Sequence, residues 1–461
     1  MKRYIVIVLA AVVTSCGIYK PYERPEVATG GLYGAENVET DTVSVAQLAW
    51  EEFFTDEELQ GLIRYGLEHN TDMQAAHWRI EEAEAALKSA RLAYLPSFNL
   101  APNGGVSSFD GSKASWTYTA PLSASWQIDI FGGITNAKRR AKAVYAESEE
   151  YQQAVRVQLI SAIANYYYTL LMLDGQHEAT RLVAASLDSS AETMRALMEG
   201  GMANAAGVAQ IEAAAYDAHA TLLDIEHSIV AVESSLCALL GDAPHSIARG
   251  TLDEQQMPEE LSIGVPVSLL SRRPDVRMAE YRLMQAHYAT AAARSQLYPT
   301  LTLSGLLGWT NNVGSIVTNP GGLILSAAAS LTAPIFNSGK LRAQVRIAEA
   351  QREEVMLAFE QSLLNAGSEV NTALSQVQTA RQKLQLRTSQ VEALAKAAEA
   401  TQLLMDYGST TYLEVLTAQQ SLLAGQIAAI SDRFDEIQGC VNLYIALGGG
   451  SEREESREQD K

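Results

Sequence analysis

The stretch of sequence that decides the fold occurs twice in this chain. Residues 69–100 read HNTDMQAAHWRIEEAEAALKSARLAYLPSFNL, and residues 272–303 read RRPDVRMAEYRLMQAHYATAAARSQLYPTLTL. The two stretches superpose without a gap at an offset of about 203, which pairs Asp72 with Asp275, Arg91 with Arg294 and Pro96 with Pro299. The register continues almost to the end of each half, where Leu240-Gly241 answers Leu447-Gly448. A duplication of this size predicts one pseudo-symmetric architecture rather than two unlike domains.

The composition argues against one class of partner. The chain has 34 Lys and Arg against 54 Asp and Glu, a formal net charge of −20. Phosphate binding favours a basic patch instead, so nucleic acid is not an expected partner. An acidic surface is also compatible with ordinary solubility.

The N-terminus has the pattern of a targeting segment. Lys2 and Arg3 precede an apolar run over residues 5–13, which is too short to span a bilayer as a mature helix. The following Val-Thr-Ser-Cys-Gly looks like a bacterial lipoprotein signal, which implies a signal peptide at 1–15 and a lipid on Cys16. An ordinary secretory signal with an incidental cysteine is the alternative.

Other chemistry is sparse along the chain. Cys237 and Cys440 each lie in an apolar helical pattern, and we expect buried free thiols. The seven histidines are scattered singly, so no metal site is predicted. No nucleophile, base and orienting group occur at an informative spacing, and we expect neither an enzyme nor a cofactor.

The clearest strand is residues 115–129, where apolar and polar side chains alternate throughout. Trp116 and Trp126 lie near its two ends, roughly 33 Å apart at about 3.3 Å per residue. Tilted by about 40°, the segment would cover roughly 25 Å, the apolar band of an outer-membrane strand with an aromatic girdle at each rim. A long strand of a soluble sandwich is the alternative.

Each repeat supplies one predicted β-hairpin, at about 97–129 and about 300–335. In the second, we expect a loop from Thr310 to Gly322, which is rich in Asn and Gly. Pro102 and Pro121 count against a closed barrel, because they would need bulges or positions near its end. Four strands cannot close a barrel alone, so spanning strands would force oligomerisation, with eight strands from two chains or twelve from three.

Two very long helical patterns follow the hairpins, and each returns as a helical hairpin, at about 134–240 and about 340–447. Each long arm has about 67 residues, or roughly 100 Å. Gly200, Gly201 and Gly408 break the patterns and predict the tip turns. The fold class is therefore mainly α, internally duplicated, with four β-strands and long coiled-coil-like helices per chain.

The predicted organisation has six parts. A lipidated lead-in at 16–50 follows the signal peptide. The repeats occupy 51–245 and 266–448, with a linker at 246–265 between them and a polar tail at 449–461.

Three motifs resemble one known family. They are Arg272-Arg273-Pro274-Asp275-Val276-Arg277, Asp129-Ile130-Phe131-Gly132-Gly133, and Tyr407-Gly408 with Tyr412-Leu413-Glu414-Val415-Leu416. Together with Cys16 they are most similar to the lipid-anchored branch of the TolC-like outer-membrane efflux family. The resemblance implies a homotrimer with a twelve-stranded barrel in outer-membrane lipid and a helical tunnel through the periplasm. By itself, the Arg-Arg-Pro-Asp block reads only as a helix start.

The resemblance also implies a gate where the tips of the helical hairpins meet. Glu414 matches a ring of acidic residues in the family. Thr417 stands where a second carboxylate is often found, and Thr410 where an arginine link can occur, so a two-ring gate with a latch is in doubt. Glu199 and Asp406 could add charge at the same end. For each carboxylate, the alternative is a solvated helix residue.

The implied function is a passive outer-membrane export channel. Its implied partners are a periplasmic adaptor (membrane fusion) protein and an inner-membrane RND-type pump. A type I protein-secretion duct of the same fold is one alternative, and a lipid-anchored coiled-coil scaffold is another. The exported substrate is not encoded in any pattern that we recognise.

Overall fold

The computed structural model describes residues 21–25, 48–108, 110–111, 113–258, 273–313 and 316–450. Cys16 and the expected signal peptide lie outside these ranges. The described residues fall into two compact units, and each unit combines segments of both sequence repeats. The first unit includes Trp78–Glu150 and Arg277–Gln361, and the second includes Tyr151–Val276 and the chain from Ser362.

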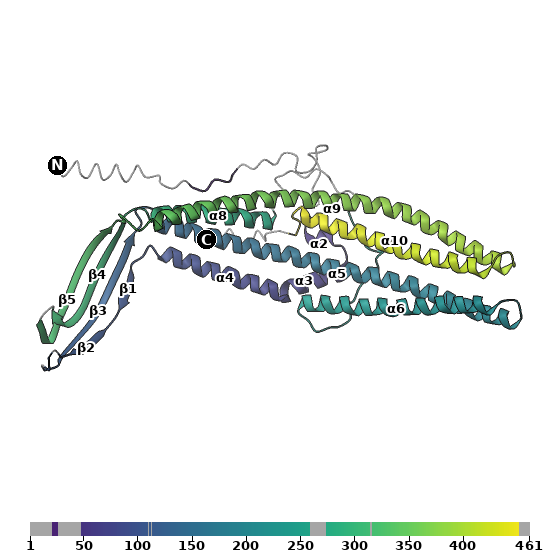
Figure 1. Cartoon of the computed structure of the whole chain (residues 1–461), viewed down its shortest axis with the longest axis horizontal. Helices are drawn as coiled ribbons and strands as arrows, with labels where there is room; N and C mark the ends of the chain where they lie inside the picture. The colour runs from purple at the N-terminus through teal and green to yellow at the C-terminus, as the bar shows by residue number, and fades with distance from the viewer. Residues whose placement is uncertain are drawn as a thin grey trace. The chain divides into compact units, whose positions relative to one another are not determined.

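The first unit contains an antiparallel sheet, shown in Figure 1. Its strands are β1 (Ser97–Leu100), β2 (Asn103–Ser107), β3 (Ser115–Ile128), β4 (Thr300–Val313) and β5 (Ile316–Thr332). The order is β1-β3-β4-β5, and β2 also pairs with β3. The first hairpin therefore joins the second through the pairing of β3 with β4, in which Trp126 lies opposite Leu303.

The expected long loop from Thr310 to Gly322 was wrong, because β4 continues to Val313 and β5 begins at Ile316. Asn311 explains the extension. Its side-chain oxygen accepts a hydrogen bond from the Tyr118 amide at 2.7 Å, and its side-chain nitrogen donates to the Trp116 carbonyl at 2.9 Å. The Asn311 side chain thus continues the contact of β4 with β3. It does so at the point where the register between β4 and β5 shifts, between Thr310 and Asn312.

The two prolines that count against a continuous sheet lie at one break. Pro102 separates β1 from β2, and the Ala101 amide bonds the Pro121 carbonyl at 3.2 Å. On the other side of β3, Pro121 lies opposite Gly308. A Cβ at Gly308 would lie 2.6 Å from the Ala120 carbonyl oxygen, so only glycine fits this approach. The sheet accommodates the two prolines because the strand on one side of β3 is interrupted between β1 and β2. On the other side, β4 carries glycine at position 308, opposite Pro121.

Over Ser115–Ser123, the apolar face of β3 is the more exposed one, whereas farther along the strand Ser125 and Gln127 of the polar face are exposed too. Trp116 is 70% exposed and Trp126 is 40% exposed, whereas the intervening Thr117 and Thr119 are partly covered. An exposed apolar face with a more covered polar face reverses the pattern of a soluble sheet. It fits a sheet whose outer face meets lipid.

Ion pairs connect the helices of the first unit. Arg282 of α8 (Pro274–Ser295) bonds Glu147 of α5 (Gly133–Glu199) at 2.6 Å. The start of α5 is capped by Asp129, whose carboxylate accepts from the Ile134 and Thr135 amides. The remaining helical segments belong to α4 (Thr71–Leu92) and α9 (Lys340–Asp406).

The second unit consists of helices around one large core. Its short helices are α2 (Trp50–Phe53) and α3 (Glu57–His69), and its returning helices are α6 (Ala205–Leu240) and α10 (Tyr412–Ala446). Figure 1 shows α6 running back along α5 and α10 running back along α9. In the core, Phe53 stacks on Tyr444 with ring centroids 4.2 Å apart. None of the described helices is long and apolar enough to cross a membrane.

Both described cysteines are buried free thiols in that core. Burial raises the pKa of the Cys440 thiol to about 11, which keeps it protonated and unreactive at neutral pH.

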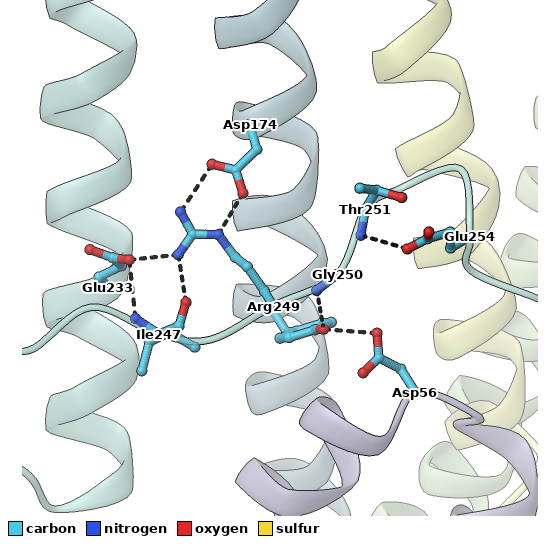
Figure 2. A network of polar contacts seen from close by, with 9 residues as sticks. Asp56, Asp174, Glu233, Ile247, Arg249, Gly250, Thr251 and Glu254 are labelled. Carbon is cyan, nitrogen blue, oxygen red and sulfur yellow. Dashed lines mark hydrogen bonds and ion pairs between the residues drawn. The ribbon is translucent and has the colours of Figure 1, made fainter.

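The segment after α6 is tied to the helices by Arg249 (Figure 2). Its guanidinium bonds Asp174 of α5 at 2.5 and 2.9 Å and Glu233 of α6 at 2.5 Å. Hydrogen bonds to Asp174 and Glu233 outweigh burial and raise the pKa of Arg249 above its usual range. The Ile247 amide also donates to Glu233 at 3.2 Å, so one cation fixes two helices and the linker together.

A second set of contacts fixes the same segment to α3. Asp56 caps that helix through the Glu58 amide and also accepts from the Tyr167 hydroxyl at 2.8 Å. The Gly250 amide donates to the same hydroxyl at 3.2 Å, and Figure 2 shows this chain of contacts beside Arg249.

We predict that Arg249→Met destabilises the second unit. The substitution keeps an unbranched, flexible side chain but removes the guanidinium and leaves Asp174 and Glu233 without their countercharge, at a cost of about 1–3 kcal/mol. Thermal unfolding of the purified protein, followed by circular dichroism, measures the loss. The matched control is Arg181→Met, which removes an exposed arginine of α5 paired with Glu178 and should leave the midpoint unchanged. Equal losses for the two variants would contradict the tie.

Candidate functional site: the tips of the helical hairpins

Both helical hairpins turn through the same backbone motif. At the end of α5, Met202 N–H bonds the Leu197 carbonyl at 2.8 Å and Gly201 N–H bonds the Met198 carbonyl at 3.0 Å. At the end of α9, Ser409 N–H bonds Leu404 and Gly408 N–H bonds Met405, each at 2.8 Å. These are Schellman motifs, and Gly201 and Gly408 adopt φ of 75° and 70°. Glycine is needed at these two positions because the left-handed region disfavours side chains.

The two hairpins differ directly after their turns. In the first, the Asn204 side chain caps α6 by accepting from the Gly207 amide at 2.8 Å. A Cβ at Gly207 would lie 3.1 Å from the terminal methyl of the buried Met194, so a larger side chain at this position would require that methyl to shift. In the second hairpin, the corresponding position is Glu414, which is exposed in the first turn of α10. The carboxylate therefore occurs once per chain.

The structure brings two of the predicted gate residues together. The Thr410 hydroxyl donates a hydrogen bond to Glu414 across the turn into α10. Thr417 lies in the same helix as Glu414, but its hydroxyl bonds the Leu413 carbonyl at 2.8 Å and is thereby occupied by its own helix. A carboxylate near a helix N-terminus is favoured by the helix dipole, and the threonine contact further orients it.

The other predicted gate carboxylates lie at the C-terminal ends of the long helices. Glu199 is the last residue of α5 and is exposed. Asp406 is the last residue of α9, and its side chain lies outside the described part of the structure. A carboxylate at a helix C-terminus is disfavoured by the helix dipole, so Glu199 contributes charge rather than helix stability.

A small apolar cluster, which the sequence reasoning missed, connects the two tips. Its buried members are Ala191, Met194, Val208 and Ile211 of the first hairpin. Met405 and Tyr412 of the second hairpin pack against them. Burial raises the pKa of Tyr412, so its phenol stays neutral. Further along, Gln419 donates to the Ser186 hydroxyl at 3.2 Å. The helical stripes predicted burial here, but no pattern showed which helix would be the partner.

The structure assembles no other chemical centre at these tips. Over the described ranges, no group of three or more His, Cys, Asp or Glu side chains is arranged to hold a metal ion. The predicted girdle residues Trp116 and Trp126 belong to β3 in the other unit. The arrangement at the tips offers an oriented carboxylate, two glycine turns and a small apolar contact.

The chain is similar to a known protein family along most of its length. The family model described as outer membrane efflux protein matches residues 62–242 and 265–449. The toluene efflux pump outer membrane protein TtgC of Pseudomonas putida is 27% identical over 463 residues, covering 96% of this chain and 94% of that protein. The pyoverdine export outer membrane protein OpmQ of Pseudomonas aeruginosa is 31% identical over 420 residues, covering 87% of each.

A solved structure shows the same fold. The open state of the Neisseria gonorrhoeae MtrE outer membrane channel superposes with a TM-score of 0.84 at 26% sequence identity, covering 95% of this chain and 99% of that one.

We predict that Gly408→Ala loosens the second tip. Alanine at a φ of 70° costs roughly 1–2 kcal/mol, and the cost falls on the turn alone. Amide hydrogen exchange of peptides spanning 404–412 should become faster. The control is Gly200→Ala, since a Cβ there meets only ordinary contacts, the nearest at 3.4 Å. The strained-turn assignment fails if the two alanine variants exchange alike at their own tips.

Proposed function

Because the chain belongs to the outer membrane efflux protein family, we propose that it is the outer-membrane channel of a tripartite efflux pump and exports small molecules passively from the periplasm. The family is one of transport proteins, and the chain's role as an outer-membrane efflux channel follows from that membership. Two of its relatives bear names for the export of small molecules, toluene for TtgC and pyoverdine for OpmQ.

Three copies of the chain form the conducting unit in this proposal. Among the described strands, β1 and β5 stand at the two ends of the sheet, and the apolar face of β3 is exposed. In lipid every backbone amide and carbonyl must find a protein partner, so both edges must pair with other copies. Three sheets of four strands, with β1 and β2 as one interrupted strand, would close a twelve-stranded barrel.

The tips form the gate of this channel. With three chains around one axis, the three Glu414 carboxylates surround the entrance, each held by Thr410. Their mutual repulsion is balanced by attraction for cations, so the entrance favours cations over anions. Thr417 supplies no second carboxylate, and Gly207 supplies none from the first hairpin. The gate therefore has one acidic ring, to which Glu199 and Asp406 add charge nearby.

The partners follow from the same architecture. Exposed apolar residues at the turns, including Tyr407 at 84% and Met202 at 75%, suit a periplasmic adaptor protein that spreads the tips. An inner-membrane RND-type pump then delivers the substrate, since the chain has no energy source of its own. Lipid on Cys16 would anchor the lead-in to the outer membrane.

The observation that carries the gate assignment is the exposed Glu414 held by Thr410 at a tip where the other repeat has glycine. We predict that Glu414→Gln lowers the cation-to-anion permeability ratio of the purified channel in planar bilayers by roughly fivefold. That is the factor given by about 1 kcal/mol of lost Coulomb attraction at the entrance. Reversal potentials in a salt gradient measure the ratio.

The matched control for this measurement is Glu212→Gln, which removes an α6 carboxylate already neutralised by Arg195 at 2.7 Å. It should leave the ratio unchanged. A conducting channel whose selectivity is the same in wild type and Glu414→Gln would refute the gate, and a protein that forms no pore would refute the channel.

A further inference from the structure

The two repeats build the same junction between strand and helix, but the chain completes only one of them by itself. In the first repeat, Phe131 follows β3 and stacks on Tyr298, with ring centroids 5.0 Å apart and planes at 19°. Tyr298 directly precedes β4, so the stack extends the β3–β4 pairing beyond the sheet. In the first repeat, the aromatic ring that follows β3 therefore contacts the residue that precedes β4.

The second repeat carries the equivalent ring after β5. Among the described strands, β5 stands at one end of the sheet, so no further strand of this chain follows it there. Ile335-Phe336 after β5 corresponds to Ile130-Phe131 after β3. Ile335 is 98% exposed and Phe336 is 87% exposed. Large apolar side chains at this exposure mark an interaction surface when they are adjacent.

The matching acceptor is present at the other end of the sheet. In the duplicated stretch, Leu95 takes the place of Tyr298, because each precedes the proline that leads into a first strand. Leu95 is 61% exposed, and Phe98 of β1 is 66% exposed. The donor ring follows β5 and the acceptor precedes β1, which are the two terminal strands of the described sheet.

We propose that Phe336 of one copy packs on Leu95 of the neighbouring copy, in an antiparallel pairing of β5 with β1 that sets Leu331 opposite Leu100 of that neighbour. The assignment copies the internal contact residue by residue. Leu331 precedes Phe336 by the interval that separates Trp126 from Phe131, and Leu100 stands where Leu303 stands in the second repeat. Trp126 and Leu303 are opposite one another in the internal pairing.

The occupant is a second copy of this chain because its first repeat carries Leu95 at the position where Tyr298 already receives Phe131. The contact is heterologous, with the second repeat of one copy meeting the first repeat of the next, and such contacts form a ring when the rotation between copies closes, as it does in the proposed trimer. Leu331 and Leu100 are 67% and 68% exposed, so both are open to that pairing. This inference rests on the proposed trimer and adds the residues that join its copies.

Cysteine cross-linking tests the register. Residues directly opposite in an antiparallel pair have Cα atoms about 4.5–5.5 Å apart, within the range that a disulfide spans. After mild oxidation of outer-membrane extracts, the double variant Leu100→Cys with Leu331→Cys should run as a covalent trimer on non-reducing gels. Each single variant should remain a monomer, because the native Cys237 and Cys440 are buried.

Two matched double variants complete the test. Trp126→Cys with Leu303→Cys, at the internal pair, should form a disulfide within one chain and no ladder. Leu100→Cys with Ala333→Cys moves one partner by two residues and should give at least several-fold fewer cross-links. A stronger ladder from this shifted pair would overturn the register and the Phe336 contact with it.

A native mass measurement on the same samples separates the two levels of the proposal. A trimer in which the internal pair cross-links but Leu100→Cys with Leu331→Cys does not would overturn the junction and leave the channel standing. A protein that is monomeric in its conducting form would overturn the trimer itself.

Discussion

Backbone pairing at the two ends of the sheet is the constraint on which the rest of the structure depends. An outer-membrane protein cannot leave a strand edge open to lipid, because each unpaired amide or carbonyl there costs several kcal/mol. The chain's own strands are too few to close on themselves. In the proposed trimer, the duplication supplies the missing partners, because a unit whose last strand pairs with the first strand of the next copy can repeat around an axis. The proposed assembly and the internal duplication thus both serve to pair the edges of the sheet.

In the proposed trimer, two identical repeats per chain would place six equal hairpin tips around the gate. The two repeats differ in their packing beside the tip. In the first hairpin, a side chain at position 207 would require the Met194 methyl to shift, because a Cβ there would lie 3.1 Å from it. In the second, the equivalent position faces outward and carries Glu414. In the proposed channel, this difference in packing leaves the carboxylate on the second hairpin alone.

The parts of this architecture that local patterns determine could be predicted from the sequence. The long helices end where Gly201 and Gly408 must adopt positive φ, and β3 follows from strict alternation. The extension of β4 could not be predicted, because it depends on Asn311 bonding the backbone of a strand 193 and 195 residues away. The role of Arg249 was missed for the same reason, since its partner Asp174 is 75 residues distant.

The candidate gate was placed by resemblance rather than by physical pattern. An exposed carboxylate in the first turn of a helix is common, and nothing in the spacing of Glu414 separates it from an ordinary capping residue. The comparison between repeats makes Glu414 informative, because the equivalent position in the first hairpin is Gly207 and carries no carboxylate. Internal comparison supplied here what a single motif could not.

The distribution of buried side chains argues that the tips are the part of the second unit that opens. The main core joins α3, α5, α6, α9 and α10 through large side chains such as Tyr167, Tyr168 and Tyr444. Toward the tips, the buried side chains form two small clusters, one of Ala184, Leu187, Ala215, Ala218 and Leu416 and one of Ala191, Met194, Val208 and Ile211. Burial of apolar area sets the cost of separation at about 25 cal/mol per Å². Proteins open first where few apolar contacts must be lost, so the proposed adaptor would act at the tips on the smallest apolar clusters of the unit, while Arg249 and the main core hold its base.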